Sequence, residues 1–346
     1  MVVNPSHRSK ITIKDVARAC GVSNQTVSRV INKRADVSRA TREKVLAAIK
    51  KMGFQPSALA RGMRQQSTTL GIILAGLEYK GVSICLQGIT QEAERHGLNL
   101  ILKELPSFNS LEMNPLIQSL IAHQVMGIIY AAPEVGGNWA KAQAKLPLFC
   151  PPIVFLKGRV SSAPITISVN NYMGAFQITR HMIKKGYRHI AHIAGPLDWF
   201  EARERKRGWT QALAEAGMTA QDNHWAEGKW DSDSGLRAFE RIYARYPDMD
   251  AVFAASDQMA LAVLNAAWAH GIRVPEELGV AGFDNIPESA HFIPPLTTVR
   301  QDLIKLGGMA VQKVLKLKDL ELNGAENNDH TTIPTELIIR QSTQRR

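Results

Sequence analysis

One short segment of the chain carries side chains of the kinds that read nucleic-acid bases. They are Asn24, Gln25, Ser28, Arg29 and Asn32. Gln and Asn can pair bidentately with adenine, and Arg can pair with the O6/N7 edge of guanine. On a helix lying in the major groove, these side chains would meet base edges. The alternative interpretation is that they only cover a solvated helix face.

Hydroxyl side chains around this segment suit a second task, which is contact with backbone phosphates. The candidates are Thr12, Ser23, Thr26, Ser38 and Thr41. Phosphate contacts fix the register of a protein on the duplex and carry no sequence information directly. The two sets together predict a DNA interface.

Three amphipathic helical patterns would have to position these groups. Their predicted buried positions are Val16, Ala17 and Cys20 in the first, Val27, Val30 and Ile31 in the second, and Val45, Leu46 and Ile49 in the third (Arg39 to Met52). Gly21 ends the first pattern and Ser23 opens the second as an N-cap. Two short helices joined by a tight turn and braced by a third predict a helix-turn-helix.

The charge distribution supports this assignment. The chain has 346 residues and a formal net charge of +11. Residues 1–68 hold 14 Lys/Arg but only three Asp/Glu, so the remainder of the chain is neutral. A basic head on a large neutral body indicates a polyanion-binding module attached to a domain with another task.

The segment ACGVSNQTVSRVINKRADVSRATREKVLAAIKKMGFQPSALARGMR resembles the DNA-binding head and hinge helix of the LacI/GalR family of bacterial transcription regulators. The resemblance implies that the hinge folds on DNA when two protomers meet, with Ser57, Ala60 and Met63 at the DNA. Met63 stands where the family usually has Leu as a wedge in the minor groove. Met is a more flexible wedge, and Gly62 weakens the hinge helix by about 1 kcal/mol relative to Ala.

Apolar runs alternate with helical patterns after Thr69, which predicts parallel sheets with helices on both faces. The expected strands are Leu70–Gly76, Asn99–Lys103, Gly127–Ala132, Pro152–Leu156, His189–Gly195, Ala251–Ser256 and Leu278–Phe283. Helices are expected over Gly174–Lys185, Glu201–Ala216 and Gln258–His270. Two sets of this kind predict two similar α/β lobes.

The resemblance extends over this body, through GYRHIAHIAGPLDWFEARERKRGW, AVFAASDQMALAVLNAAWAHGIRVPEELGVAGFDN and FIPPLTTVRQDLIKLGGMAVQKVL. It implies a periplasmic-binding-protein-like, two-lobed effector domain, with chain crossovers near 168–172, 297–302 and 328–332. The expected divisions are a disordered tail (1–10), the helix-turn-helix domain (11–56), a hinge helix or linker (57–68), and an effector-binding and dimerisation domain (69–346). Within that domain, the expected lobes are 69–169 with 301–329, and 170–300 with 330–346.

The same resemblance implies a set of effector-binding residues in the cleft between the lobes. They are Lys157, Arg203, Trp230, Ser256, Asp257, Asp284 and Gln301. Arg203 would clamp hydroxyls or a carboxylate, and Trp230 would stack on a sugar face. Lys157 stands where sugar-responsive relatives often carry Asp, which favours an anionic effector. The structural alternatives are helix capping for the aspartates, a surface ion pair for Arg203, and core packing for Trp230.

Several function classes find no support in the sequence. The chain has no catalytic, cofactor-binding or metal-binding motif of the common kinds and no run long enough to span a membrane. Its three scattered cysteines, Cys20, Cys85 and Cys150, predict buried free thiols in a cytoplasmic protein.

The sequence therefore predicts a regulator that is not an enzyme and that needs no cofactor or metal. Its expected partners are operator DNA, a carbohydrate-like effector and a second copy of itself, because a dimer matches a pseudo-palindromic site. A repressor is the leading hypothesis. A corepressor-dependent or nucleobase-responsive regulator of the same fold is the alternative. A non-specific nucleoid protein and a DNA-modifying enzyme are more distant ones.

Overall fold

The computed structural model describes residues 13–31, 37–52, 67–106, 113–135, 139, 146, 150–158, 165–321 and 329–345. The first two ranges form three short helices around one small core. The helices are α1 (Ile13–Cys20), α2 (Asn24–Ile31) and α3 (Arg39–Met52). Gly21 adopts φ +60° after α1, and Ser23 Oγ accepts the backbone N–H of Thr26 at 3.0 Å. The predicted helix end and N-cap are both confirmed.

The buried face of α3 differs from the prediction at one position. Val45 is fully buried and Ile49 is half-buried, but Leu46 is 37% exposed. The prediction for Leu46 is wrong because the face that meets the core repeats at Val45, Ala48, Ile49 and Met52. That spacing is the i, i+3, i+4, i+7 period of a helix, and Leu46 lies about 100° round from Val45.

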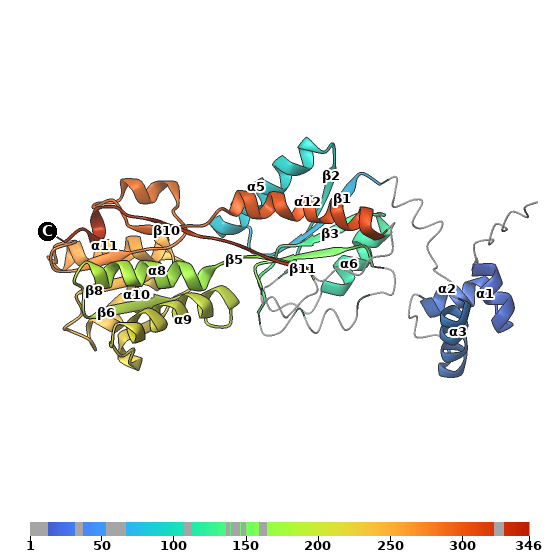
Figure 1. Ribbon diagram of the computed structural model, residues 1–346, viewed down its shortest axis with the longest axis horizontal. Coiled ribbons are helices and arrows are strands. Elements are labelled where there is room, and N and C mark those ends of the chain that lie inside the picture. The colour runs from blue at the N-terminus through green and yellow to red at the C-terminus, as the bar shows by residue number, and fades with distance from the viewer. Residues whose placement is uncertain are drawn as a thin grey trace, which may run out of the picture.

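Six of the described strands form one parallel sheet, in the order β11-β5-β4-β3-β1-β2. The strands are β1 (Thr69–Leu74), β2 (Asn99–Glu104), β3 (Gly127–Tyr130), β4 (Ile153–Leu156), β5 (Ile165–Val169) and β11 (Asp329–Ile333). Helices α5 (Lys80–Arg95) and α12 (Leu303–Glu321) cover one face, and α6 (Met113–Ala122) covers the other (Figure 1). Alternate residues of β1 enter the two cores, as the pleat requires.

A second parallel sheet contains four described strands in the order β7-β6-β8-β9. They are β6 (Ile190–Ala194), β7 (Trp225–Glu227), β8 (Ala251–Ala254) and β9 (Gly279–Ala281). Helices α8 (Asn171–Lys184) and α9 (Phe200–Glu215) pack on one face, and α10 (Ser232–Tyr243) and α11 (Asp257–Ala269) pack on the other. The predicted pair of α/β units is therefore present.

The chain passes between the two sheets at three places within the described residues. The first crossing follows β5, and the second lies between β10 (Thr298–Arg300) and α12. The third lies between β11, which pairs with β5, and β12 (Glu336–Ile338), which pairs antiparallel with β10. It is later than the expected 328–332, so residues 330–333 belong with the first sheet. The crossing is later because residues Asp329 to Ile333 pair with β5 and so remain in the first sheet.

Close packing of α5 against α12 fixes where the N-termini of both helices lie. A Cβ on Gly88 would lie 2.2 Å from the backbone oxygen of Ile304, and a Cβ on Gly307 would lie 2.3 Å from that of Cys85. The two glycines therefore allow the helix backbones to approach closely. This contact holds Lys80 and Leu303, the first residues of the two helices, at the junction of the two sheets.

Candidate functional site

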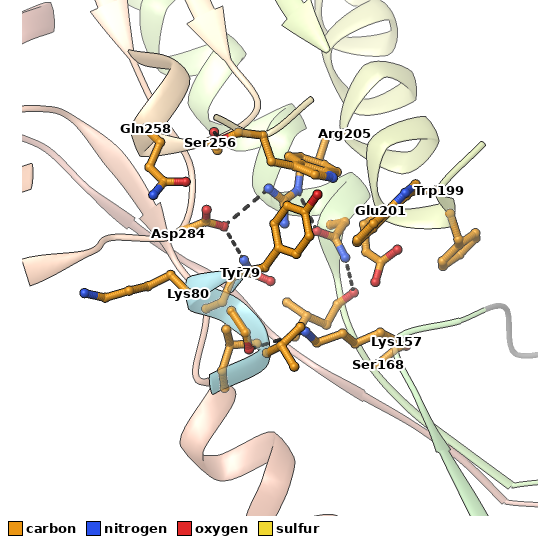
Figure 2. A pocket seen from close by; sticks show the side chains of 18 residues that line it. Tyr79, Lys80, Lys157, Ser168, Trp199, Glu201, Arg205, Ser256, Gln258 and Asp284 are labelled. Carbon is orange, nitrogen blue, oxygen red and sulfur yellow. Dashed lines mark hydrogen bonds and ion pairs between the residues drawn. The ribbon is translucent and has the colours of Figure 1, made fainter. Parts of the chain in front are cut away.

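A cavity lies where the two sheets meet, at the carboxyl ends of their strands, and it encloses about 750 Å³ including its open mouth. This is a volume that suits a small organic ligand, and such crevices are where open α/β sheets bind one. The residues that line it are Tyr79, Lys80, Gly81, Val82, Lys157, Ser168, Val169, Asn171, Trp199, Phe200, Glu201, Arg205, Trp230, Ser256, Gln258, Asp284, Gln301 and Leu303. Figure 2 shows their side chains converging from both sheets.

A charged network around Arg205 forms one wall of the cavity (Figure 2). Its guanidinium, 5% exposed, donates from Nε to Asn171 Oδ1 at 2.8 Å and from Nη1 to the Ala255 carbonyl and to Asp284 Oδ1. Gln301 Nε2 donates to the same Asp284 oxygen at 2.6 Å. The guanidinium also lies over the Phe283 ring, 3.8 Å from its centroid. Arg205 is therefore held rigidly by bonds that do not involve its Nη2.

The backbone at Asp284, which positions its carboxylate in this network, has an unusual conformation. Its φ is +112° and that of Asn285 is +54°, in a region that residues other than glycine rarely adopt. Asp284 N donates to the Val299 carbonyl at 2.8 Å, and Arg340 Nη2 donates to Asn285 Oδ1 at 2.7 Å. These bonds hold the strained turn, which presents the Asp284 carboxylate to the cavity. Burial raises the pKa of Asp284, while Arg205 and Gln301 oppose that rise.

Trp230 forms another wall, and its position depends on a glycine. A Cβ on Gly195 would lie 2.2 Å from the indole ring, so only glycine leaves room for it there. Ser256 Oγ donates to the Trp230 carbonyl at 3.1 Å and also accepts the backbone N–H of Met259 at 3.2 Å as the N-cap of α11. The indole Nε1 is buried and has no hydrogen-bond partner among the described residues. Ser256 thus supports the wall, and Trp230 keeps one unused donor.

Lys157 and Glu201 approach the cavity from different sheets. Lys157 follows β4 with φ +65°, and its Nζ donates to the Gly81 carbonyl at 3.4 Å, a long contact. Glu201, in the first turn of α9, is 7% exposed and lies between Tyr79 and Trp199 in Figure 2. Burial raises the pKa of Glu201, and the charge of Lys157 is the strongest influence that opposes it.

Five of the seven predicted effector residues line the cavity. They are Lys157, Trp230, Ser256, Asp284 and Gln301. Arg203 does not, because its Nη1 donates to the Leu197 carbonyl at 2.8 Å on another side of α9. The arginine of the cavity is Arg205, which shares a face with Glu201 at the i, i+4 spacing. The helical spacing of Arg205 from the apolar residues Ala202 and Trp209, which are buried, could have indicated from the sequence that Arg205 faces inward.

Asp257, the other predicted residue outside the cavity, is fully buried behind it. Its carboxylate accepts hydrogen bonds from Thr298 Oγ1 and from the backbone N–H of Ile286. Burial, together with the charge of Asp284, raises the pKa of Asp257 to about 8. Asp257 therefore supports the turn that carries Asp284 instead of touching a ligand directly.

This raised pKa predicts a pH-dependent stability that Asp257→Asn should remove. Below about pH 4 the carboxyl is protonated in the folded and unfolded chain alike. From there to about pH 8 only the unfolded chain loses the proton, so the free energy of unfolding falls as the pH rises, by at most about 1.4 kcal/mol per unit. An amide can donate to Thr298 and accept from Ile286 without titrating. Urea denaturation between pH 5 and 8 should thus show a flatter profile for Asp257→Asn.

The exposed Asp248 provides the control for this measurement. Asp248→Asn removes a carboxylate of the same type and should leave the slope of the wild type in place. Equal slopes for Asp257→Asn and the wild type would contradict a raised pKa at Asp257.

The predicted DNA-contacting side chains of the head fall into three groups. Ser23, Asn24, Gln25, Arg29 and Ser38 are exposed, and Thr26, Ser28 and Thr41 are half-exposed. Ser23 and Ser38 accept backbone N–H groups of Thr26 and Thr41, so both predicted phosphate contacts are also N-caps, at helix ends that attract anions. Outside the described residues lie Thr12, Asn32, Ser57, Ala60 and Met63.

Other kinds of site receive little support from the described part of the chain. No group of three His, Cys, Asp or Glu there could hold a metal ion, and no helix there is long and apolar enough to cross a membrane. Cys20 and Cys85 are buried free thiols as predicted, whereas Cys150 is half-buried.

Comparison with known proteins gives a consistent result. The model of the lacI family of bacterial regulatory proteins matches residues 12–57, and that of the periplasmic binding protein-like domain matches residues 179–343. The chain is 31% identical to catabolite control protein A of Priestia megaterium, over 96% of this chain and 99% of that protein. It is also 31% identical to the HTH-type transcriptional repressor PurR of Haemophilus influenzae (strain PittEE), over 96% and 98%. PurR is a transcriptional repressor by name, and neither relative is named as an enzyme.

Solved structures agree with these relatives. The lac repressor dimer bound to operator and the anti-inducer ONPF is similar with a TM-score of 0.73 and 29% identity, over 97% of this chain and 99% of that one. The complex of the transcriptional regulator CelR with cellobiose is similar with a TM-score of 0.70 and 29% identity, over 96% and 99%. The predicted helix-turn-helix head and two-lobed α/β body are confirmed.

Proposed function

The chain belongs to the lacI family of bacterial regulatory proteins, and from this premise we propose that it represses transcription by binding a specific operator. The operator is pseudo-palindromic and is bound by a homodimer. A carbohydrate or carbohydrate derivative in the cavity controls that binding. The observation that carries the proposal is the joining of a helix-turn-helix head to a ligand-sized cavity between two sheets, which charged and polar side chains help to line.

The head supports the DNA-binding half of the proposal. Asn24, Gln25 and Arg29 are exposed on α2, while Val27 and Val30 hold the opposite face of that helix in the core. We assign base contacts to the exposed group together with Ser28 and Asn32. Phosphate contacts are assigned to Thr12, Ser23, Thr26, Ser38 and Thr41. Minor-groove contacts are assigned to Ser57, Ala60 and Met63.

The chain divides accordingly into parts with separate tasks. We assign a tail to residues 1–10, the head to 11–56, the hinge to 57–68 and the effector and dimer part to 69–346. The pairing of β11 with β5 moves the last lobe boundary, so the lobes become 69–169 with 301–333, and 170–300 with 334–346. Because its task is on DNA, we place the protein in the cytoplasm.

The effector half rests on the cavity and on a relative. Lys157, Arg205, Trp230, Asp284 and Gln301 offer donors, acceptors and a ring in one enclosed space, which is what a polyhydroxylated ligand requires. The similar regulator CelR forms a complex with cellobiose. Since the chain crosses between the sheets at the cavity, a ligand that prefers one arrangement of the sheets would shift the population towards it.

The test of the proposal is selection of binding sites from random duplex DNA with the full-length chain. A sequence-specific regulator should enrich one inverted-repeat sequence, bound at least about 1,000-fold more tightly than random DNA at the same salt concentration. A nucleoid protein would enrich none and would bind all duplexes equally. Enrichment of a site without the two-fold repeat would contradict the homodimer.

An exposed apolar strip on α11 is the surface that we assign to the dimer. Trp268 is 81% exposed and Leu261 is 41% exposed, and their i, i+7 spacing places them on one face of the helix. Trp268→Asp with Leu261→Asp should convert the dimer into monomers in analytical ultracentrifugation and lower operator affinity, because two heads must bind together. Ile304→Asp, which changes an exposed apolar residue on α12, is the control and should leave a dimer.

A further inference from the structure

Two opposite charges line the same part of the cavity without an ion pair between them in the described chain. Lys157 follows β4 of the first sheet, and Glu201 begins α9 beside the second sheet. The charge of Lys157 lowers the pKa of Glu201 against the effect of burial. The two side chains therefore face one space from opposite sheets.

Glu201 is more than nine-tenths buried, and its Oε2 has no hydrogen-bond partner among the described residues. A buried acceptor left without a donor is costly, so a group that donates to it gains affinity. The first turn of α9 favours a negative charge at this position through the helix dipole. Among the described residues, Lys157 Nζ has a single and long hydrogen bond, to the Gly81 carbonyl, so it too can donate to a ligand.

The charges around the cavity balance one another. Of the described lining residues, Lys80, Lys157 and Arg205 are cations, and Glu201 and Asp284 are anions. Lys80 forms an ion pair with Glu288 at 3.2 Å, outside the lining set. Arg205 pairs with Asp284 at 3.3 Å, which leaves Lys157 and Glu201 to balance each other. The lining itself therefore carries one more cation than anions, and Glu288 beside it brings the sum to zero, so the described residues offer no positive excess to an anionic effector.

We propose that Glu201 and Lys157 form a hydroxyl clamp, which selects a neutral polyhydroxylated effector and rejects acidic ones. This inference rests on the proposed function and names the chemistry of its ligand. A hydroxyl group can accept from Lys157 Nζ and donate to Glu201 Oε2 at once. A carboxylate or phosphate could accept from Lys157 but would place its charge against that of Glu201. Glu201 is the specificity-determining residue, and it replaces the anion hypothesis based on Lys157 alone.

The clamp also links the ligand to the arrangement of the sheets. One of its arms follows β4 and the other begins α9, so a bridged hydroxyl ties the two sheets together at the cavity. Arg205 and Asp284 differ from the clamp, because they pair with each other and both belong to the second sheet, so a ligand bound to them alone would not connect the two sheets. Binding at Glu201 and Lys157 thus favours the arrangement in which the two residues are close.

The test uses the full-length chain and two matched pairs of probes. These are cellobiose with cellobionate, and glucose with glucose 6-phosphate, titrated by calorimetry at one ionic strength and pH. The wild type is expected to bind the neutral member of a pair at least about ten-fold more tightly than its anion. Binding of an anion as tightly as its neutral partner, or binding of neither neutral probe, would overturn the clamp.

Glu201→Gln keeps the shape of the side chain and removes its charge. It should weaken the neutral probe about ten-fold, through loss of a charge-assisted hydrogen bond, and should strengthen the matching anion. The exposed Asp198 lies nearby on the approach to α9, so Asp198→Asn is the control that removes a charge outside the lining set. It should leave the ratio of the two affinities as in the wild type.

Lys157→Gln gives an independent measurement if Glu201→Gln does not fold. It should weaken the neutral probe without strengthening the anion. An unchanged ratio in both variants would refute the clamp. The selection of an operator by the wild type does not depend on these results, so failure of the clamp and failure of the proposed function are separable.

Discussion

Arg205→Met is expected to abolish effector binding, with a dissociation constant raised more than about 100-fold. The guanidinium is buried and bound to Asn171, Ala255 and Asp284, so its removal leaves the Asp284 carboxylate without its cation. Breaking a buried ion pair in this way costs about 3–5 kcal/mol of stability. Chemical denaturation and calorimetric titration with the neutral sugars measure the two effects.

Arg203→Met is the matched control for this result. Arg203 lies on the same helix, but its Nη1 donates to the Leu197 carbonyl, outside the cavity. It should keep effector affinity within about three-fold of the wild type. Loss of binding in Arg203→Met with retention in Arg205→Met would show that the ligand lies elsewhere. Because the head has its own core, operator binding without effector should persist in both variants wherever they fold.

The second large effect is expected at the head. Arg29→Ala should cost about 1–3 kcal/mol per protomer on the selected operator, and about twice that for a dimer that carries the residue in both heads. Arg29 is exposed on α2, whose buried face is fixed by Val27 and Val30. On random duplex DNA the loss should be small, because a base contact is absent there. Electrophoretic mobility shifts at fixed salt measure both affinities.

Arg18→Ala tests whether the loss of a positive charge alone explains the lower operator affinity of Arg29→Ala. Arg18 is exposed on α1 and forms a 3.7 Å ion pair with Asp15. A general electrostatic contribution would be reduced about equally on the operator and on random DNA. If Arg29→Ala behaves in the same way, Arg29 contacts phosphate and does not read a base.

Local patterns were sufficient to predict the head. The helices of the head are short and follow one another in the chain, so their ends depend on near neighbours such as Gly21 and Ser23. The prediction of a buried Leu46 was wrong because adjacent apolar residues on a helix point about 100° apart, and the helix buries Val45 instead. Only contact with the other two helices selects between adjacent apolar residues at that point.

Strand and helix alternation likewise predicted most of both sheets. The strands of the two sheets that sequence patterns missed, β5, β7 and β11, depend on their neighbours. β5 is completed by β11, about 160 residues later, and β7 has only three residues. Their register comes from pairing with distant strands, and a local pattern does not contain that information.

The cavity shows the same division between local and tertiary information. The family resemblance, the basic head and five of the cavity residues could be predicted from the sequence alone, because each of these residues lies in a recognisable motif. The packing of the chain was needed to show that Arg205 and not Arg203 lines the cavity, that Asp257 is buried behind it, and that Glu201 and Lys157 line it together. The physical reason is that charge balance in a cavity is set by side chains from two sheets, whose meeting no local pattern records.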